Sequence, residues 1–250
     1  MISQILHRGT LRRWSRSARE AVSVPLSTLR AEANRARQLR HHLDEVIFRA
    51  EDRLALPAIG SSTFYKPKNS DWAWRPQLWK GPLPQVGLVA VDSQTRFGED
   101  ATIFHDCRSS ELTIRQLRNQ READLAPYGV RMDVFGFDGS FLSMAIDLPS
   151  EAATGLKKNH LIRLNTIIET EKPLEIFARL NLRHGPNTEQ IVRELPLAQE
   201  DVWVEFDLAY TKLNERRAER MWLDLIFEGP QMNQIVIRDV TFSRSPRADL

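Results

Sequence analysis

Apolar and polar residues alternate in short runs along the second half of the chain. The runs cover residues 102–105, 129–137, 140–148, 160–169, 174–183, 188–195, 201–210, 221–228 and 234–242. A period of two is the pattern of a half-buried strand, and Gly, Pro and Asn residues separate most of the runs. The spacing leaves no room for the crossover helices of a parallel sheet. We therefore predict a mainly β fold, an antiparallel β-sandwich of jelly-roll type.

Three local features of this pattern need a structure to settle them. The dipeptide Asp138-Gly139 is a hairpin turn signal, so we expect the runs 129–137 and 140–148 to pair with each other. The segment 112–117 fits either a helix or a strand. Residues 213–221 are compatible with one or two helical turns inside a connection.

The first 56 residues have a helical period instead. Residues 2–22 form a short basic helix that Val24-Pro25 ends, because a residue before proline avoids helical geometry. A second helix starts after the N-cap Ser27 and runs to about residue 56, before Pro57. Its apolar positions, three and four residues apart, are Leu29, Ala33, Ala36, Leu39, Leu43, Val46, Ile47, Ala50 and Leu54. This narrow stripe could dock on the β domain, pair with another copy or lie on a surface.

The division into domains follows from these patterns. Residues 1–56 are a helical arm, the small, polar and proline-containing segment 57–70 is a linker, and 71–250 is the β domain. The domain begins with Trp72, Trp74 and Trp79, close to two prolines. We interpret this tryptophan-rich segment as a structural wrap over apolar surface, in preference to an aromatic binding platform.

The net charge of +2 hides an uneven distribution. Residues 1–53 hold eleven Arg and no Lys against six acids, a surplus of +5, so the rest of the chain is at about −3. Such an arm suits an anionic surface, the acidic face of a partner or self-association, and we do not expect nucleic acid as the partner. A solvated helix that happens to use arginine is an equally good interpretation.

Apolar stretches and cysteine content bear on where the protein resides. No stretch approaches the roughly 18–20 apolar residues that cross a bilayer. We expect a bacterial cytoplasmic protein, although the Arg-rich, Ser-containing start, free of acids up to Glu20, also resembles an organellar transit peptide. The single cysteine, Cys107, precludes an intrachain disulfide.

Catalytic and metal-binding patterns are weak. In His105-Asp106-Cys107, a strand would place the histidine and the cysteine on one face and the acid on the other, so we expect a buried structural cysteine. One cysteine and scattered histidines predict no metal site, and no cofactor motif is present. Four acids are candidates for a glycosidase pair, although their spacing selects none: Asp147, Asp207, Asp224 and Glu228. We name no catalytic residue and favour a non-enzymatic protein.

The most informative polar positions lie on two neighbouring runs. In 174–183, Arg179 and Asn181 alternate with apolar residues, and Arg163 and Asn165 do so in 160–169. If these strands pair, guanidinium and amide groups share one face, where they can bond sugar hydroxyls or carboxylates. The candidate ligand-binding residues are Arg163, Asn165, Arg179, Asn181, Arg183, His184 and Asn187. An ordinary solvated sheet face is the alternative.

Three segments carry a resemblance to a known superfamily. They are Asp138-Gly139-Ser140-Phe141, the strand FARLNL at 177–182, and the closing strand IVIRDV at 235–240. Residues 131–241 resemble the jelly-roll domains of galactose-binding-like proteins and carbohydrate-binding modules, and the whole chain is similar to uncharacterised bacterial families. The resemblance implies a module that binds a saccharide or another small polar ligand. The alternative is an adaptor whose basic arm tethers the β domain to a partner or an anionic surface.

Overall fold

The structure is a computed structural model that describes residues 2–58, 64, 66–121, 124–197 and 201–247. The chain divides into two compact units, Met1–Ala50 and Glu51–Leu250. The first unit contains α1 (Ile2–Glu20) and most of α2 (Leu26–Ala58), close to the predicted helices. Part of the predicted linker, residues 59–63 and 65, lies outside the described residues, so the boundary between arm and domain stays a prediction.

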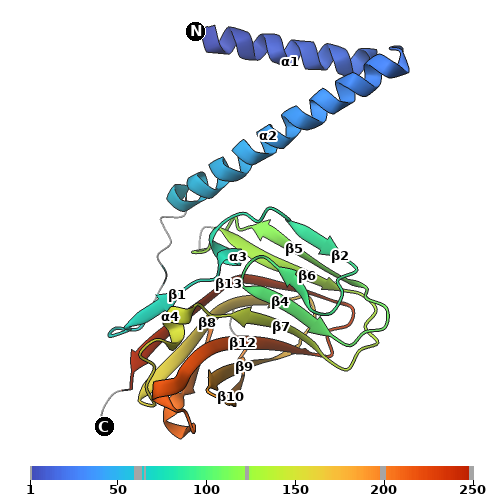
Figure 1. Cartoon of the computed structure of the whole chain (residues 1–250). Helices are drawn as coiled ribbons and strands as arrows, with labels where there is room; N and C mark the ends of the chain where they lie inside the picture. Colours follow the sequence, from blue (N-terminus) through green and yellow to red (C-terminus); the bar gives the residue numbers. More distant parts are fainter. Residues whose placement is uncertain (1, 59–63, 65, 122–123, 198–200, 248–250) are drawn as a thin grey trace. The chain divides into compact units, whose positions relative to one another are not determined.

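The second unit is built from two antiparallel sheets (Figure 1). The seven-stranded sheet has the order β11 (Asp201–Asp207), β8 (His160–Thr170), β13 (Asn233–Pro246), β6 (Tyr128–Val134), β5 (Leu112–Arg118) and β2 (Gly87–Val89), with β1 (Trp72–Trp74) paired to β13. The six-stranded sheet has the order β10 (Asn187–Glu194), β9 (Glu175–His184), β12 (Ala218–Glu228), β7 (Leu142–Asp147), β4 (Ala101–His105) and β3 (Thr95–Phe97). The predicted jelly-roll-type sandwich with a helical arm is confirmed.

Short helical pieces occupy some of the connections: α3 (Gln77–Lys80), α4 (Ser150–Ala153) and the 3-10 turns η1 (Leu208–Tyr210) and η2 (Glu215–Arg217). The ambiguous segment 112–117 is a strand, β5. Among the described helices, none has an apolar stretch of the length that a bilayer requires.

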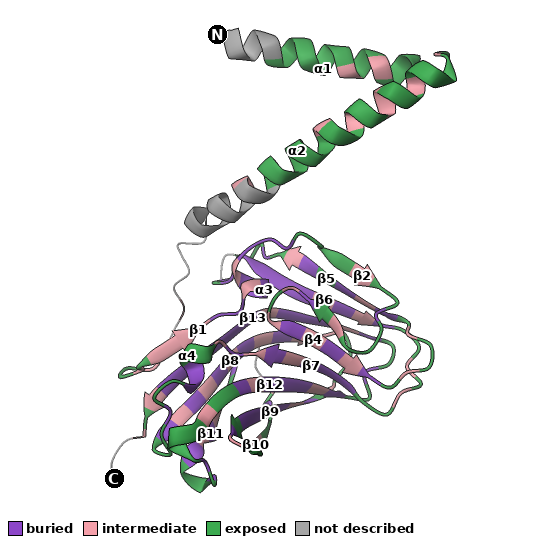
Figure 2. Cartoon of the chain, viewed as in Figure 1, coloured by how far each residue is buried: buried purple, intermediate pink, exposed green. Residues whose placement is uncertain are grey.

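The core lies between the two sheets, and along several strands, such as β4 and β8, buried residues alternate with less buried ones (Figure 2). On β9 the buried positions include Ile176, Ala178 and Leu180, and on β12 they include Leu223 and Leu225. The residues between them therefore form the outer face of the six-stranded sheet.

The predicted hairpin between 129–137 and 140–148 is wrong. β6 belongs to the seven-stranded sheet and β7 to the six-stranded sheet, so the loop at Asp138-Gly139 crosses between layers. The Asp106 carboxylate accepts hydrogen bonds from the Ser140 amide and hydroxyl and from the Phe141 amide. These bonds hold the start of β7 against the segment that follows β4, with which β7 pairs.

The tryptophan-rich segment runs along β13. The strand β1 pairs antiparallel with it, and Trp79 is fully buried, with its indole N–H donating to the Ile237 carbonyl at 2.9 Å. Arg75 is 1% exposed and forms a bidentate ion pair with Asp239 of β13. Trp79 and Arg75 thus attach this segment to the sandwich core.

Candidate functional site

The predicted ligand patch is divided between the two sheets. Arg163 and Asn165 lie on β8, which pairs with β11 and β13, whereas Arg179 and Asn181 lie on β9, which pairs with β10 and β12. The assumed pairing of β8 with β9 is therefore wrong. The side chain of Asn233, at the start of β13, bonds both backbone groups of Lys172 and holds the connection where it leaves the seven-stranded sheet.

The residues on the seven-stranded sheet have partners of their own. The Arg163 guanidinium stacks 4.2 Å from the Trp203 ring centre and bonds Glu205 at 2.7 and 2.9 Å. Asn165 lines a cavity of about 60 Å³, far smaller than the roughly 300–1,000 Å³ of ligand pockets. Neither residue lines the one pocket of ligand size that is described below for the six-stranded sheet.

Three further candidates lie at the end of β9. Arg183 is exposed and pairs loosely with Glu219 at 3.6 Å, and Asn187 is exposed where β10 begins. His184 is buried, and its Nδ1 accepts a 3.4 Å hydrogen bond from the Asn214 amide. None of the three lines a described pocket of ligand size. Of the seven predicted residues, Arg179 and Asn181 are left, and they lie on β9 beside a larger pocket, which Arg179 lines.

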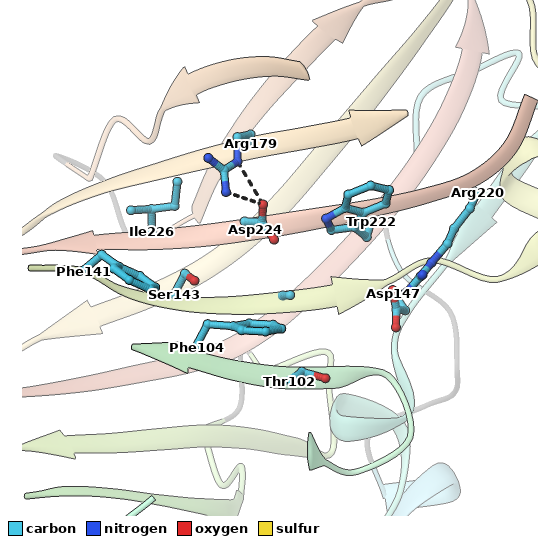
Figure 3. A pocket seen from close by; sticks show the side chains of 11 residues that line it. Thr102, Phe104, Phe141, Ser143, Asp147, Arg179, Arg220, Trp222, Asp224 and Ile226 are labelled. Carbon is cyan, nitrogen blue, oxygen red and sulfur yellow. Dashed lines mark hydrogen bonds and ion pairs between the residues drawn. The ribbon is translucent and has the colours of Figure 1, made fainter. Parts of the chain in front are cut away.

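A larger hollow, of about 590 Å³, opens on the outer face of the six-stranded sheet (Figure 3). Its volume lies within the usual range of ligand pockets. Four adjacent strands and the residue before β7 supply its lining: Thr102, Phe104, Phe141, Ser143, Ala145, Asp147, Arg179, Arg220, Trp222, Asp224 and Ile226. We call this the outer-face pocket.

The pocket exists because the strand that crosses its middle carries short side chains. Ala145 of β7 lies opposite Asp224 on one side and Thr102 on the other. Its methyl group leaves open space between the longer side chains of β12 and β4. Ser143, two residues away on the same face, also has a short side chain, so the centre of the pocket stays open above β7.

A buried carboxylate forms the polar floor. Three donor contacts, each 2.9 Å long, converge on Asp224 Oδ2, from Nε and Nη2 of Arg179 and from Nδ2 of Asn181. Gln190 Nε2 in turn donates to Asn181 Oδ1 at 2.9 Å. Within the described residues, Asp224 Oδ1 has no such partner, and Figure 3 shows it on the side away from Arg179. The carboxylate is therefore held in place with one oxygen available as an acceptor.

The role expected for Asn181 changes accordingly. Its side chain faces outward from the core, as the alternation predicts, yet the residue is 1% exposed because Asp224, Gln190 and the neighbouring strands enclose it. It positions the carboxylate from below and does not reach the open pocket. Arg179 is partly exposed and lines the pocket itself.

Aromatic side chains form the walls. Trp222 is half-buried, and the Arg220 guanidinium lies 5.4 Å from its ring centre while pairing with Asp147. Phe104 and Phe141 line the opposite side (Figure 3). Sequence reasoning missed Trp222, although a signal existed: it occupies an outward position in a run whose alternate residues are apolar core.

Two of the four acids considered for glycoside cleavage meet in this pocket. Asp147 faces Trp222 across the β7–β12 pair, and Asp224 faces Ala145, so the two carboxylates are diagonal neighbours. Asp147 pairs with Arg220 and Asp224 with Arg179. Lone pairs that a nucleophile or base would use are thus partly occupied by arginines. The pocket lining contains two cations and two anions.

Other reactive groups lie elsewhere. Cys107 is half-buried, not fully buried as expected, and its burial raises the pKa of the thiol, opposite to the need of a nucleophile. His105 uses Nε2 to bond the Val91 carbonyl at 2.7 Å and accepts the Cys107 amide on Nδ1. In the part of the chain that the structure describes, no group of three or more His, Cys, Asp or Glu side chains could hold a metal ion.

Comparison with protein families places the chain. Residues 1–250 match the model of a family of unknown function, DUF6478, and the chain belongs to this family. No curated protein matches the sequence significantly.

Several solved structures are similar to this chain at low identity. A tailspike protein of bacteriophage CBA120 aligns with a TM-score of 0.43 and 10% identity, over 62% of this chain and 21% of the tailspike. A family 11 carbohydrate-binding module of Clostridium thermocellum, in complex with a mixed-linked tetrasaccharide, gives 0.38 and 9% identity, over 66% of this chain and 99% of the module. A xylan-binding domain of Paenibacillus barcinonensis gives 0.39 and 9% identity, over 66% and 100%. Carbohydrate-binding modules, which the sequence resembles, are thus among the structures that are similar to this chain. Similarity this remote says nothing about the ligand of this chain.

Proposed function

We propose that this protein is a non-enzymatic binding module that holds a saccharide in the outer-face pocket. The observation that carries the proposal is Asp224, a buried carboxylate whose Oδ2 takes three donor contacts from Arg179 and Asn181, whereas its Oδ1 has no donor among the described residues. A sugar hydroxyl can donate to such an oxygen, and a hydrogen bond to a charged acceptor contributes about 1.5–3 kcal/mol.

The surroundings of the carboxylate suit the two-sided character of a sugar ring. Trp222 and Phe104 supply apolar surface for the C–H groups. The Nη1 donors of Arg179 have no acceptor among the described residues and can donate to ring or hydroxyl oxygens. Because two cations balance two anions in the lining, the pocket favours a neutral saccharide over a strongly charged one.

The chain offers a matched pair of tryptophans for the test. Trp222 lines the pocket, whereas Trp203 lies on the other sheet, and each has an arginine near its ring. The full chain is screened against neutral and acidic oligosaccharides by glycan array and thermal shift. For a saccharide found in this way, Trp222→Ala should weaken binding about 10- to 100-fold, whereas Trp203→Ala should leave it unchanged. Equal effects of the two variants, or no neutral saccharide bound, would refute the proposal.

Glycoside hydrolysis is a second candidate, because Asp147 and Asp224 both line the pocket. Diagonal neighbours on paired strands lie roughly 7–8 Å apart, compatible with the roughly 6.5–9.5 Å of an inverting pair. Both carboxylates are, however, engaged by arginines. We expect binding without turnover, and release of reducing ends from the bound saccharide, lost in Asp224→Asn, would favour the enzyme instead.

A further inference from the structure

The helix α1 carries most of the basic surplus of the arm. Between residues 2 and 19 it holds five arginines and no acid, whereas residues 26–58 of α2 hold six arginines against five acids. Four of the five, Arg8, Arg12, Arg16 and Arg19, are three or four residues apart and thus share one side of the helix. We call them the arginine row. All four are exposed.

Three of the four arginines of the row line one surface depression. Leu11, Arg12, Ser15, Arg16 and Arg19 line a shallow hollow of about 360 Å³ on α1. Arg19 is held in place by its Nε, which donates to the Ser15 carbonyl at 3.3 Å. Several guanidinium groups beside one hollow provide the planar donors that bind phosphate oxygens bidentately.

Exposed apolar residues accompany the row. Leu11 is 56% exposed, and Val22, just after the helix, is 95% exposed. Figure 2 colours most of the described part of α1 as exposed. Trp14 is half-buried, one helical turn from Leu11. Basic residues and exposed apolar residues thus occur together on α1 and just after it, and a helix that lies in the plane of a membrane interface combines the same two kinds of residue.

We propose that α1 is a docking surface for an anionic lipid membrane, with the arginine row on the lipid phosphates and Leu11 and Val22 in the headgroup–acyl boundary. Charge complementarity selects an anionic partner. The exposed apolar residues favour a membrane over a nucleic acid, since phosphate-backbone contacts need no apolar partner. This interaction does not depend on the saccharide pocket, which belongs to the other compact unit.

The number of arginines sets how much membrane affinity the variant without the arginine row should lose. Each basic side chain near an anionic surface strengthens binding about fivefold, so loss of the whole arginine row should weaken it by several hundredfold. Salt should weaken the wild-type interaction as well, because surface charges are screened over about 10 Å at 0.1 M ionic strength.

The test uses the full chain and vesicle co-sedimentation. Vesicles of phosphatidylcholine alone are compared with vesicles that also contain phosphatidylglycerol. The protein should bind the anionic vesicles at low salt, dissociate from them at high salt and show no binding to the neutral vesicles. The variant Arg8→Gln/Arg12→Gln/Arg16→Gln/Arg19→Gln should lose binding, and lysines at the same four positions should largely restore it.

The chain supplies a control of equal charge. Four exposed arginines of α2, replaced as Arg30→Gln/Arg35→Gln/Arg37→Gln/Arg40→Gln, change the net charge by the same amount and should retain most of the binding. Circular dichroism of each variant checks that the helices persist. A third variant, Leu11→Ser/Val22→Ser, keeps every charge and should weaken vesicle binding roughly tenfold.

Four results would overturn the proposal. Equal binding to neutral and anionic vesicles would show that charge plays no role. An equal loss of vesicle binding in the α1 and α2 variants would show that the arginine row has no special role. Binding to a DNA or RNA oligonucleotide but not to vesicles would make nucleic acid the partner. Unchanged binding by Leu11→Ser/Val22→Ser would show that no apolar insertion takes place.

Discussion

Replacing Arg75 by Met should break the buried ion pair that fixes the tryptophan-rich segment to the sandwich. Arg75 is 1% exposed, and its Nε and Nη2 bond the two oxygens of Asp239 at 2.9 and 2.7 Å. Its guanidinium also lies 5.0 Å from the ring centre of Phe64. Methionine fills much of the same volume but leaves the Asp239 carboxylate buried without a cation.

The expected loss is large. Removing one partner of a buried ion pair costs about 3–5 kcal/mol, because the desolvated charge that remains has no compensation. The free energy of unfolding of a typical domain is only about 5–15 kcal/mol, so the loss should shift the unfolding transition to a clearly lower urea concentration. Urea unfolding of the full chain, followed by tryptophan fluorescence, measures it. The exposed pair between Arg183 and Glu219 is the control, and Arg183→Met should change the free energy of unfolding by about 0.5 kcal/mol or less.

The raised pKa of Asp239 predicts how the stability of the wild type and of the Arg75→Met variant changes with pH. Burial raises the pKa of Asp239 above its ordinary value, and the hydrogen bond and charge of Arg75 only partly oppose this. Because the folded-state pKa is raised, protonation of Asp239 favours the folded state, and that contribution is lost as the pH rises through the folded-state pKa. In Arg75→Met the pKa should rise further, so the deficit of the variant should shrink in mildly acidic buffer.

A second substitution separates the charge from the packing. In Arg75→Met/Asp239→Leu no charge stays buried, and the double variant should be more stable than Arg75→Met alone. If Arg75→Met costs less than about 1 kcal/mol, or if its deficit is the same at every pH, the ion pair does not hold the segment in the way described.

Three further predictions concern other parts of the chain. Burial lowers the pKa of His160 below 6.5, and its Nδ1 accepts a hydrogen bond from the Lys157 amide, so stability should fall as the pH drops below 6.5; in His160→Gln this part of the pH profile should vanish. Asn181→Ala should cost about 1–3 kcal/mol in urea unfolding because it leaves buried polar groups without partners, and a loss below about 0.5 kcal/mol would mean that the network is not formed. Removal of residues 1–56 should leave a cooperative unfolding transition, and its disappearance would place the arm within the core of the fold.

Most strands of the sandwich were predictable from the sequence, whereas their partners were not. Alternation with a period of two placed β4 and β6 to β13, because each of these strands buries one face, whichever sheet it belongs to, but it left β5 ambiguous. For the same reason, the sequence does not distinguish two strands paired as a hairpin from two strands in different sheets. Strands such as β8 and β9 bury alternate residues in both cases. The bonds that decide the matter, such as those of Asp106 to the start of β7, join residues over 30 positions apart.

The outer-face pocket was likewise only partly predictable from the sequence. Arg179 was identified from its own strand, and Asp147 and Asp224 were recognised as candidate acids. The space between them depends on Ala145, an inconspicuous residue that matters because β12 and β4 lie on either side of it. Only the register of three strands that are not consecutive in the chain makes this arrangement visible.

Blocking the pocket at Ala145 is the most direct test of saccharide binding at this site. Ala145→Leu would place three more carbon atoms in the open space beside Asp224 while leaving the contacts of Asp224 with Arg179 in place. Isothermal titration calorimetry with the saccharide identified by the screen should show affinity reduced at least about tenfold, with a nearly unchanged melting temperature. Wild-type affinity in a folded Ala145→Leu protein would contradict the account, because the saccharide would then bind somewhere else.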